Sequence, residues 1–237
     1  MRAEETVAGA GVIYSPKLGK VLGHVYGDYL MTDPLPQKYA KRGYHHGDLR
    51  AALIETGMRL IEFSDADQLS LRQVAREVGV SAAAVYRHFP DKDAFLAALA
   101  EEGLNRLGAA QRQAAAKAGY GAQGFNASGR TYVRFALKHP ALFKMIMSHT
   151  PQVDHFAADA TSVSSPMRWL RSSVAALAPE DASAEELRSA ALRAWSKVHG
   201  LAMLMLDGQI APDDSLIDAV LDGRDIWPAP VSANLKN

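Results

Sequence analysis

Two groups of residues in this chain have the types and spacing to do chemistry. The first lies around two short predicted helices and consists of Arg72, Tyr86, Arg87, His88 and Lys92. Lysine and arginine can neutralise phosphate, and an arginine fork can also read the edge of a guanine. The second group is Trp195 and His199, whose four-residue spacing places both on one face of a predicted apolar helix. The first group predicts nucleic-acid binding and the second a small-molecule pocket.

A pair of helices joined at Gly79 must position the first group. Four apolar residues recur at the helical spacing i, i+3, i+4, i+7 and share one face: Leu71, Val74, Ala75 and Val78. A capping box, S-x-x-Q, begins at Ser70. Gly79 can take the left-handed turn of a tight corner, Ser81 can cap the next helix, and Val85 and Phe89 then face inward. This arrangement predicts a helix-turn-helix, whose second helix can lie in the DNA major groove.

The same segment resembles the TetR-type transcriptional regulators. The pattern G-V-S-x-x-x-V-Y-x-H-F-x-x-K-x-x-F runs from Gly79 to Phe95, within a match from about Gly47 to Leu99. A weaker match, W-x-x-x-H-G from Trp195 to Gly200, resembles a signature of one TetR C-terminal subgroup. The resemblance implies a homodimer whose last two long helices form the interface, and a body that binds an effector.

The resemblance also gives Tyr86, His88 and Lys92 contacts with the DNA backbone. Arg72 lies in the first turn of its helix and can reach a guanine or a phosphate. Alanines at 82–84 replace the polar residues of many relatives and can touch only thymine methyl groups. The predicted DNA-binding residues are Lys41, Arg42, Ser70, Arg72, Ser81, Ala82, Ala83, Ala84, Tyr86, Arg87, His88 and Lys92.

The chain is predicted to be all-α, with a three-helix DNA-binding head at 38–92 and a larger helical body at 93–227 that binds the effector and dimerises. We expect 1–37 to be a poorly ordered leader or a non-native start, and 228–237 to be a tail. Periodicity and breakers predict helices at 47–64, 92–117, 126–138, 140–149, 165–178, 184–207 and 213–222. The inner face of the first helix is predicted to carry Leu49, Leu53, Leu60 and Phe63, and the glycines at 119, 121 and 124 to form a loop.

The second group predicts an effector pocket that is mainly apolar. Its predicted lining is Phe135, Phe143, Met147, His149, Trp195 and His199. Methionines at 145, 147, 203 and 205 would add adaptable surface, and the scarcity of charge favours an apolar or neutral effector. The alternative is that these side chains simply fill a core or a dimer interface.

The dimer interface is predicted near the C-terminus of the body. Its apolar residues recur at helical spacing and need an apolar partner: Leu187, Leu216, Ile217, Val220 and Leu221.

Charge and composition narrow the function further. The 237 residues carry 26 Lys and Arg against 26 Asp and Glu, so a basic DNA-binding face must be a local patch. With no cysteine, no apolar run long enough for a membrane and no signal-peptide core, we expect a cytoplasmic protein without membrane contact.

The sequence motifs give little support for an enzyme. No His, Asp or Glu set has metal-ligand spacing, so we expect no metal and no cofactor. The G-x-G-x-x-G at 119–124 follows a helix rather than a strand, which excludes a dinucleotide site. The predicted function is a DNA-binding repressor that a small molecule releases from its operator. The alternatives are a regulator of the same fold without an effector, and an α-helical enzyme using His199 or His149.

Overall fold

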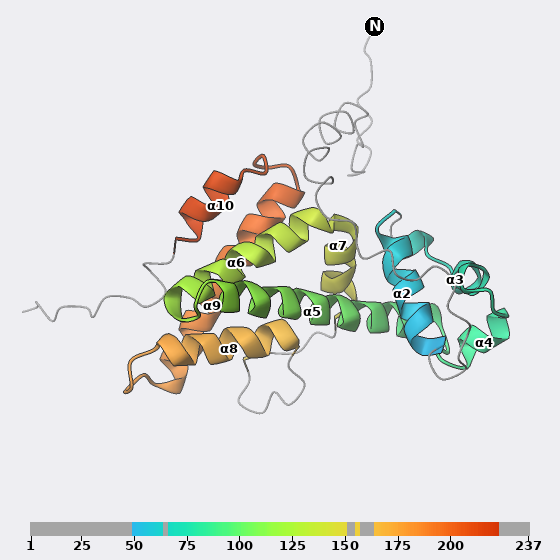
Figure 1. The fold of residues 1–237 in the computed structure, drawn as a ribbon, viewed down its shortest axis with the longest axis horizontal. Coiled ribbons are helices and arrows are strands. Elements are labelled where there is room, and N and C mark those ends of the chain that lie inside the picture. The colour runs from blue at the N-terminus through green and yellow to red at the C-terminus, as the bar shows by residue number, and fades with distance from the viewer. Residues whose placement is uncertain (1–48, 64–65, 151–154, 157–163, 223–237) are drawn as a thin grey trace, which may run out of the picture. The chain divides into compact units, whose positions relative to one another are not determined.

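The computed structural model describes residues 49–63, 66–150, 155–156 and 164–222 (Figure 1). Over these residues the chain is all-α, which confirms the predicted fold class. The helices are α2 (Leu49–Ile61), η1 (Ala66–Gln68), α3 (Leu71–Val78), α4 (Ala82–Tyr86), α5 (Lys92–Lys117), α6 (Gly121–Lys138), α7 (Pro140–His149), α8 (Ser165–Leu177), α9 (Ala184–Leu206) and α10 (Asp214–Val220). The predicted leader at 1–37, Lys41, Arg42 and the tail at 228–237 lie outside the described residues.

The helix-turn-helix forms with both serines as N-caps, although only the Ser70 half of the predicted S-x-x-Q capping box is present. Ser70 Oγ accepts a hydrogen bond from the Gln73 amide at 3.4 Å, and Ser81 Oγ accepts one from the Ala84 amide at 3.2 Å. Gly79 between them has φ 81° and ends α3 in the left-handed conformation. The turn therefore depends on a residue without a Cβ, and it aims α4 away from α3.

The core under these helices contains the apolar residues that the periodicity assigns to it. Val74, Val85 and Phe89 are buried, and Phe89 meets Phe95 of α5 edge to face at 4.8 Å between ring centroids. The prediction for α2 was wrong at Phe63, which is 85% exposed. Helix α2 ends at Ile61, so Phe63 leaves the helical register, and Ile61 is buried in its place.

Helix α5 belongs to two cores at once. Asp91 caps its start by accepting a 2.7 Å hydrogen bond from the Ala94 amide. Its first half packs with α2, α3 and α4, and its second half contributes Leu107 to the core of α6, α7 and α9. Figure 1 shows α5 running from the helix-turn-helix to α6 and α8. One continuous helix therefore joins the helix-turn-helix to the body.

Helix α7 packs against α5 and contributes to the same core as the helix-turn-helix. Leu142, Met145 and Ile146 are buried in the core that contains α2 and the helix-turn-helix. A Cβ on Gly103 of α5 would lie 2.5 Å from Ile146 Cδ1 and 2.9 Å from its Cγ1, so the glycine leaves room for the Ile146 side chain between α5 and α7. A 3.3 Å contact between His139 Nδ1 and Glu62 Oε1 also connects the start of α7 with the segment after α2.

The predicted loop at 119–124 ends earlier than expected, because α6 begins at Gly121. Gly124 lies inside the helix, where a Cβ would come within 3.0 Å of the Ala115 carbonyl oxygen on α5. The missing side chain at this position therefore allows α5 and α6 to pack closely and is not required by a turn. The remaining body helices begin and end within a few residues of their predicted bounds.

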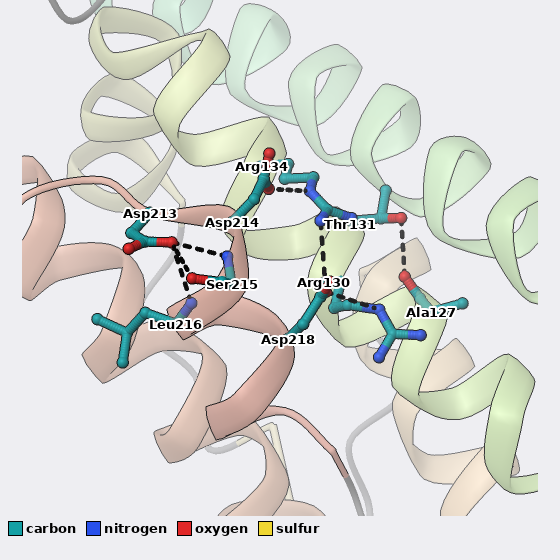
Figure 2. A network of polar contacts seen from close by, with 9 residues as sticks. All are labelled: Ala127, Arg130, Thr131, Arg134, Asp213, Asp214, Ser215, Leu216 and Asp218. Atoms are coloured by element: carbon teal, nitrogen blue, oxygen red, sulfur yellow. Dashed lines mark hydrogen bonds and ion pairs between the residues drawn. The ribbon is translucent and has the colours of Figure 1, made fainter.

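The short helix α10 is held along α6 by charge (Figure 2). Arg134 contacts Asp214 at 2.7 Å and Asp218 at 3.3 Å, and Arg130 contacts Asp218 at 3.4 Å. Asp213 caps α10 by accepting hydrogen bonds from the Ser215 and Leu216 amides at 2.7 and 3.2 Å. Such half-exposed ion pairs each contribute about 0–1 kcal/mol, so they orient α10 while the buried Ile217 anchors it.

Candidate DNA-binding face and effector cavity

The polar side chains predicted to contact DNA lie on the surface of α3, α4 and the turn after it. Arg72, Tyr86, Arg87 and His88 are exposed, as are Ser70 and Ser81 at the helix starts. The alanines at 82, 83 and 84 are alternately half-buried and exposed. Because α4 has only five residues, the exposed groups that can reach a duplex come mostly from its C-terminal end and from α3.

Lys92 has a second contact that its sequence position did not reveal. Its ammonium donates a 2.7 Å hydrogen bond to the Asp67 carbonyl oxygen, across a separation of 25 residues. The contact ties the start of α5 to η1. An ammonium has three donors, so a phosphate contact remains compatible with this bond.

A cavity of about 530 Å³ opens between α5, α6, α8 and α9. The described residues that line it are Leu104, Leu107, Gln111, Phe125, Ser128, Gly129, Tyr132, Met147, Thr150, His155, Ser164, Pro166, Met167, Trp169, Leu170, Ala194, Trp195 and Val198. None of these residues is Asp, Glu, Lys or Arg. The size and the apolar wall with a few polar groups are those of a small-molecule site.

Three buried polar atoms of this lining have no hydrogen-bond partner among the described residues: Gln111 Oε1, His155 Nδ1 and Trp169 Nε1. An unpaired buried polar atom costs about 1–3 kcal/mol, and most native polar atoms avoid that cost. All three atoms belong to residues that line the cavity, so a polar group bound there is the natural candidate for their missing partner.

The predicted pocket residues divide into two sets. Trp195 and Met147 line the cavity. Phe143 is fully buried and meets Tyr132 edge to face at 5.6 Å, Phe135 packs against the His139 ring at 5.0 Å, and neither is part of the lining. His149 also lies outside it, with Nδ1 3.1 Å from the Met145 carbonyl oxygen. Of the predicted methionines only Met147 reaches the cavity, because Met145 and Met205 are buried in the cores.

His199 lies one layer behind the cavity wall. Its Nδ1 is 3.0 Å from the Tyr132 hydroxyl, and its ring centroid lies 6.0 Å from that of Trp195. A phenol can donate to a bare ring nitrogen or accept from an N–H, so the His199 tautomer sets the direction of the bond. Burial raises the pKa of Tyr132 to about 12 and lowers the pKa of His199, which favours the neutral form of both groups.

Sequence reasoning missed the contributions of α5 and α8 to this cavity. Gln111 did carry a signal, because it interrupts an apolar stripe formed with Leu104 and Leu107 at helical spacing. Trp169 carried none, since nothing in the α8 sequence shows which of its sides faces α5.

Three apolar side chains on the last two helices are exposed. Leu192 and Leu204 on α9 are 46% and 48% exposed, and Leu216 on α10 is 37% exposed. Ile217 and Leu221, which we had assigned to the interface, are instead 0% and 5% exposed in the core formed with α6 and α9. Their apolar partner is within the chain, so they have little surface to offer a second subunit. Leu187 packs near Val174, and Val220 is half-buried.

These elements define a helix-turn-helix regulator with a helical body, and comparison with known proteins gives its family. Residues 53–99 match the family described as bacterial regulatory proteins, tetR family. Residues 125–223 match the tetracyclin repressor-like C-terminal domain. The chain belongs to the TetR family and is a DNA-binding transcription regulator.

Solved structures agree with this assignment. A protein of unknown function from Rhodococcus sp. RHA1 is 34% identical, with a TM-score of 0.61 over 77% of this chain and 96% of that one. A TetR family transcription regulator from Marinobacter aquaeolei VT8 is 19% identical, with a TM-score of 0.50 over 73% of this chain and 91% of that one. At that identity the second likeness concerns the fold alone.

The described residues contain neither a candidate membrane-spanning helix nor a candidate metal-binding cluster. None of the described helices combines the length and apolarity that crossing a membrane requires. No set of three or more His, Asp or Glu in the described segments is placed to hold a metal ion.

Proposed function

We propose that this regulator is a homodimeric repressor that a small molecule, bound in the cavity, releases from its operator. The observation that carries the proposal is that the cavity and the helix-turn-helix share two helices. Leu104 and Leu107 of α5 and Met147 of α7 line the cavity, and both helices also pack into the core beneath α3 and α4.

The mechanism is a shift between two populations. A dimer must hold its two recognition helices about 34–36 Å apart to fit successive major grooves. An occupant that prefers one arrangement of α5 and α7 changes that separation through the shared core. An effector with equal affinity for both arrangements would release nothing, so the cavity must differ between them.

The DNA-binding part of the proposal rests on the exposed groups of α3, of α4 and of the turn after it, together with the half-buried Lys92 at the start of α5. Arg72, Arg87 and Lys92 supply positive charge in a chain whose net charge is zero. Tyr86 and His88 add hydrogen-bonding groups beside them. The proposed role of Lys92 is a phosphate contact, and that of Arg72 a base or phosphate contact.

The proposed dimer face is the exposed side of α9 together with Leu216 of α10. Leu192, Ser196, Gly200 and Leu204 follow each other at four-residue spacing along α9. A glycine in a helix costs about 1 kcal/mol relative to alanine, and a Cβ at Gly200 would meet nothing within 4 Å in the subunit. Close approach of the partner's α9 supplies a reason for this glycine.

The test is release of DNA. The chain is titrated onto a labelled duplex from the region upstream of its own gene, and small molecules are then added. Displacement by an apolar, neutral molecule, lost in a Trp195→Ala variant that still binds DNA, supports the proposal. DNA binding that no ligand of the cavity alters would favour the alternative, a regulator without an effector.

A further inference from the structure

The polar atoms of the cavity specify what it can bind. We propose that the effector is a neutral, ring-containing molecule that carries both a hydrogen-bond donor for Gln111 Oε1 and an acceptor for Trp169 Nε1. This inference rests on the proposed function, because it assumes that the cavity is the effector site.

Gln111 is held so that its carbonyl oxygen remains free. The residue is 7% exposed, and its Nε2 donates to the Ser128 carbonyl oxygen at 3.3 Å. The Ser128 hydroxyl is itself used, since it donates to the Phe125 carbonyl oxygen at 2.7 Å. The amide therefore has a fixed orientation, and its Oε1 faces no donor among the described residues. Its partner must be a donor, and a ligand hydroxyl or N–H that displaces water from the cavity can supply one.

Trp169 requires a hydrogen-bond acceptor from the ligand, whereas Gln111 requires a donor. Its Nε1 is buried and has no partner among the described residues, and an indole N–H can only donate. The matching ligand group is an uncharged acceptor such as a hydroxyl, ether or carbonyl oxygen. Gln111 and Trp169 come from α5 and α8, which pack against each other, so one ligand can span both.

The other polar side chains of the lining are mostly engaged. The Thr150 hydroxyl donates to the Ile146 carbonyl oxygen at 2.6 Å, and the Tyr132 hydroxyl is 3.0 Å from His199 Nδ1. His155 Nδ1 is free, but an imidazole nitrogen can donate or accept and so does not choose between ligand classes. The discriminating atoms are therefore Gln111 Oε1 and Trp169 Nε1.

Charge and ring stacking complete the description. No Asp, Glu, Lys or Arg lines the cavity among its described residues, so a buried ammonium would lack a counter-charge and a buried carboxylate would meet only the His155 imidazole. Aromatic rings of Phe125, Tyr132, Trp169 and Trp195 form much of the wall, and flat faces of this kind favour a ring over an alkyl chain.

The experiment uses four probes with one ring system: naphthalene, 2-methoxynaphthalene, 2-naphthol and 2-naphthoate. They offer no polar group, an acceptor only, a donor with an acceptor, and an anion. Each is titrated by calorimetry into the full chain without DNA. We expect affinity to rise from naphthalene through 2-methoxynaphthalene to 2-naphthol, by about two- to tenfold for each hydrogen bond gained, and 2-naphthoate to bind least.

Two variants test which residue is responsible for each gain in affinity along the series. Gln111→Leu should remove the advantage of 2-naphthol over 2-methoxynaphthalene, and Trp169→Phe the advantage of 2-methoxynaphthalene over naphthalene. Gln113→Leu makes the same chemical change at an exposed position of α5 and should leave the series unchanged.

Equal affinity for naphthalene and 2-naphthol in the unaltered chain, preference for 2-naphthoate, or no binding of any probe would overturn the inference even if a variant failed to fold. Because these titrations contain no DNA, they are independent of release. Binding in the expected order without release from the operator would sustain the ligand class and contradict the proposed function. Release of the operator by a charged molecule would support the proposed function and contradict the ligand class.

Discussion

Arg72 and Lys92 illustrate how two cations near the same helices can have different roles. Arg72 is exposed in the first turn of α3, where its fork is free to meet a base edge. Lys92 is half-buried and already donates to the Asp67 carbonyl oxygen. The first can contribute to sequence preference, whereas the second is a point charge held in place by the protein.

We therefore expect Lys92→Ala to weaken binding to operator and random DNA alike and to lower the slope of log affinity against log salt by about one. Arg72→Ala should cost about 1–3 kcal/mol at the operator and relax the preference for one base pair, if its contact is bidentate. Competition between operator and random duplexes at several salt concentrations measures both effects. Lys117→Ala, at the other end of α5, is the control. A change of sequence preference in Lys92→Ala would reverse the assigned roles.

His199 gives a pH dependence whose sign can be worked out. Burial lowers the pKa of His199, so the folded chain favours the neutral ring while the unfolded chain titrates at the ordinary value. The unfolded state therefore binds more protons as the pH falls below about 6.5. The contribution is present above that pH and is lost as the pH falls toward the folded pKa.

The free energy of unfolding should thus fall more steeply from pH 7.5 to 5.5 in the unaltered chain than in His199→Asn. Asparagine retains an acceptor near the position of Nδ1 but does not titrate. Urea denaturation at one fixed protein concentration measures this, because dimerisation would otherwise alter the apparent stability. Identical pH dependence in the two proteins would show that His199 is not the responsible group.

At the scale of elements, the joint between α5 and α7 is the contact on which the proposed mechanism depends. Gly103→Ala should destabilise the chain by about 1–3 kcal/mol, because the new methyl group overlaps Ile146. Ile146→Val removes the Cδ1 atom that lies 2.5 Å from the added Cβ and should restore part of that loss. Thermal unfolding of the single and double variants measures the coupling. Strictly additive effects would mean that the helices are not packed against each other there.

The helices themselves were largely predictable because their signals are local. Capping residues such as Asp91 and breakers such as Pro140 fixed the bounds of α5 and α7 in the sequence. The errors came from contacts between elements. The sequence predicts Gly124 as a loop residue, whereas it lies inside α6. The glycine allows close packing on Ala115 of α5, a contact that the local sequence does not reveal.

The candidate sites divide in the same way. The proposed DNA-binding face is a continuous segment, so helical spacing predicts which side chains of α3 and α4 are exposed, while the roles proposed for Tyr86, His88 and Lys92 come from the family resemblance. The cavity joins α5, α6, α8 and α9, and periodicity shows that Gln111 or Phe143 faces inward without showing what lies opposite. That is why Phe143 was placed in the pocket although it is packed in the core, and why Trp169 was missed. Likewise, the apolar spacing of Ile217 could not distinguish a partner subunit from α6 of its own chain.

The prediction for the dimer interface also concerns a single element, helix α9. Leu204 is 48% exposed on α9, so Leu204→Glu should leave the subunit folded but convert dimers to monomers with poor operator affinity. Phe63→Glu, at a side chain 85% exposed outside α9 and α10, is the matched control and should remain dimeric. Sedimentation velocity and circular dichroism measure the two properties. A Leu204→Glu protein that sediments as the dimer would place the interface elsewhere.

At the scale of the whole molecule, the two sites must influence each other equally. If occupancy of the cavity weakens operator binding by some factor, operator binding must weaken cavity binding by the same factor. This equality follows from the thermodynamic cycle and does not depend on the route through α5 and α7. Simple competition, in which ligand and DNA meet at the same surface, would instead prevent any complex that holds both at once.

The expected result is that the best cavity ligand binds the operator complex about 5–150-fold more weakly than the free chain, the usual range of allosteric coupling. The measurement is the ligand dissociation constant with and without saturating operator, beside the operator constant with and without saturating ligand. Random DNA at the same concentration is the control for general electrostatic effects. Trp195→Ala should lose the ligand's affinity while its operator affinity stays unchanged. Equal ligand affinity in the free and operator-bound chain would contradict a coupled mechanism, because a ligand without preference for either state cannot move their equilibrium.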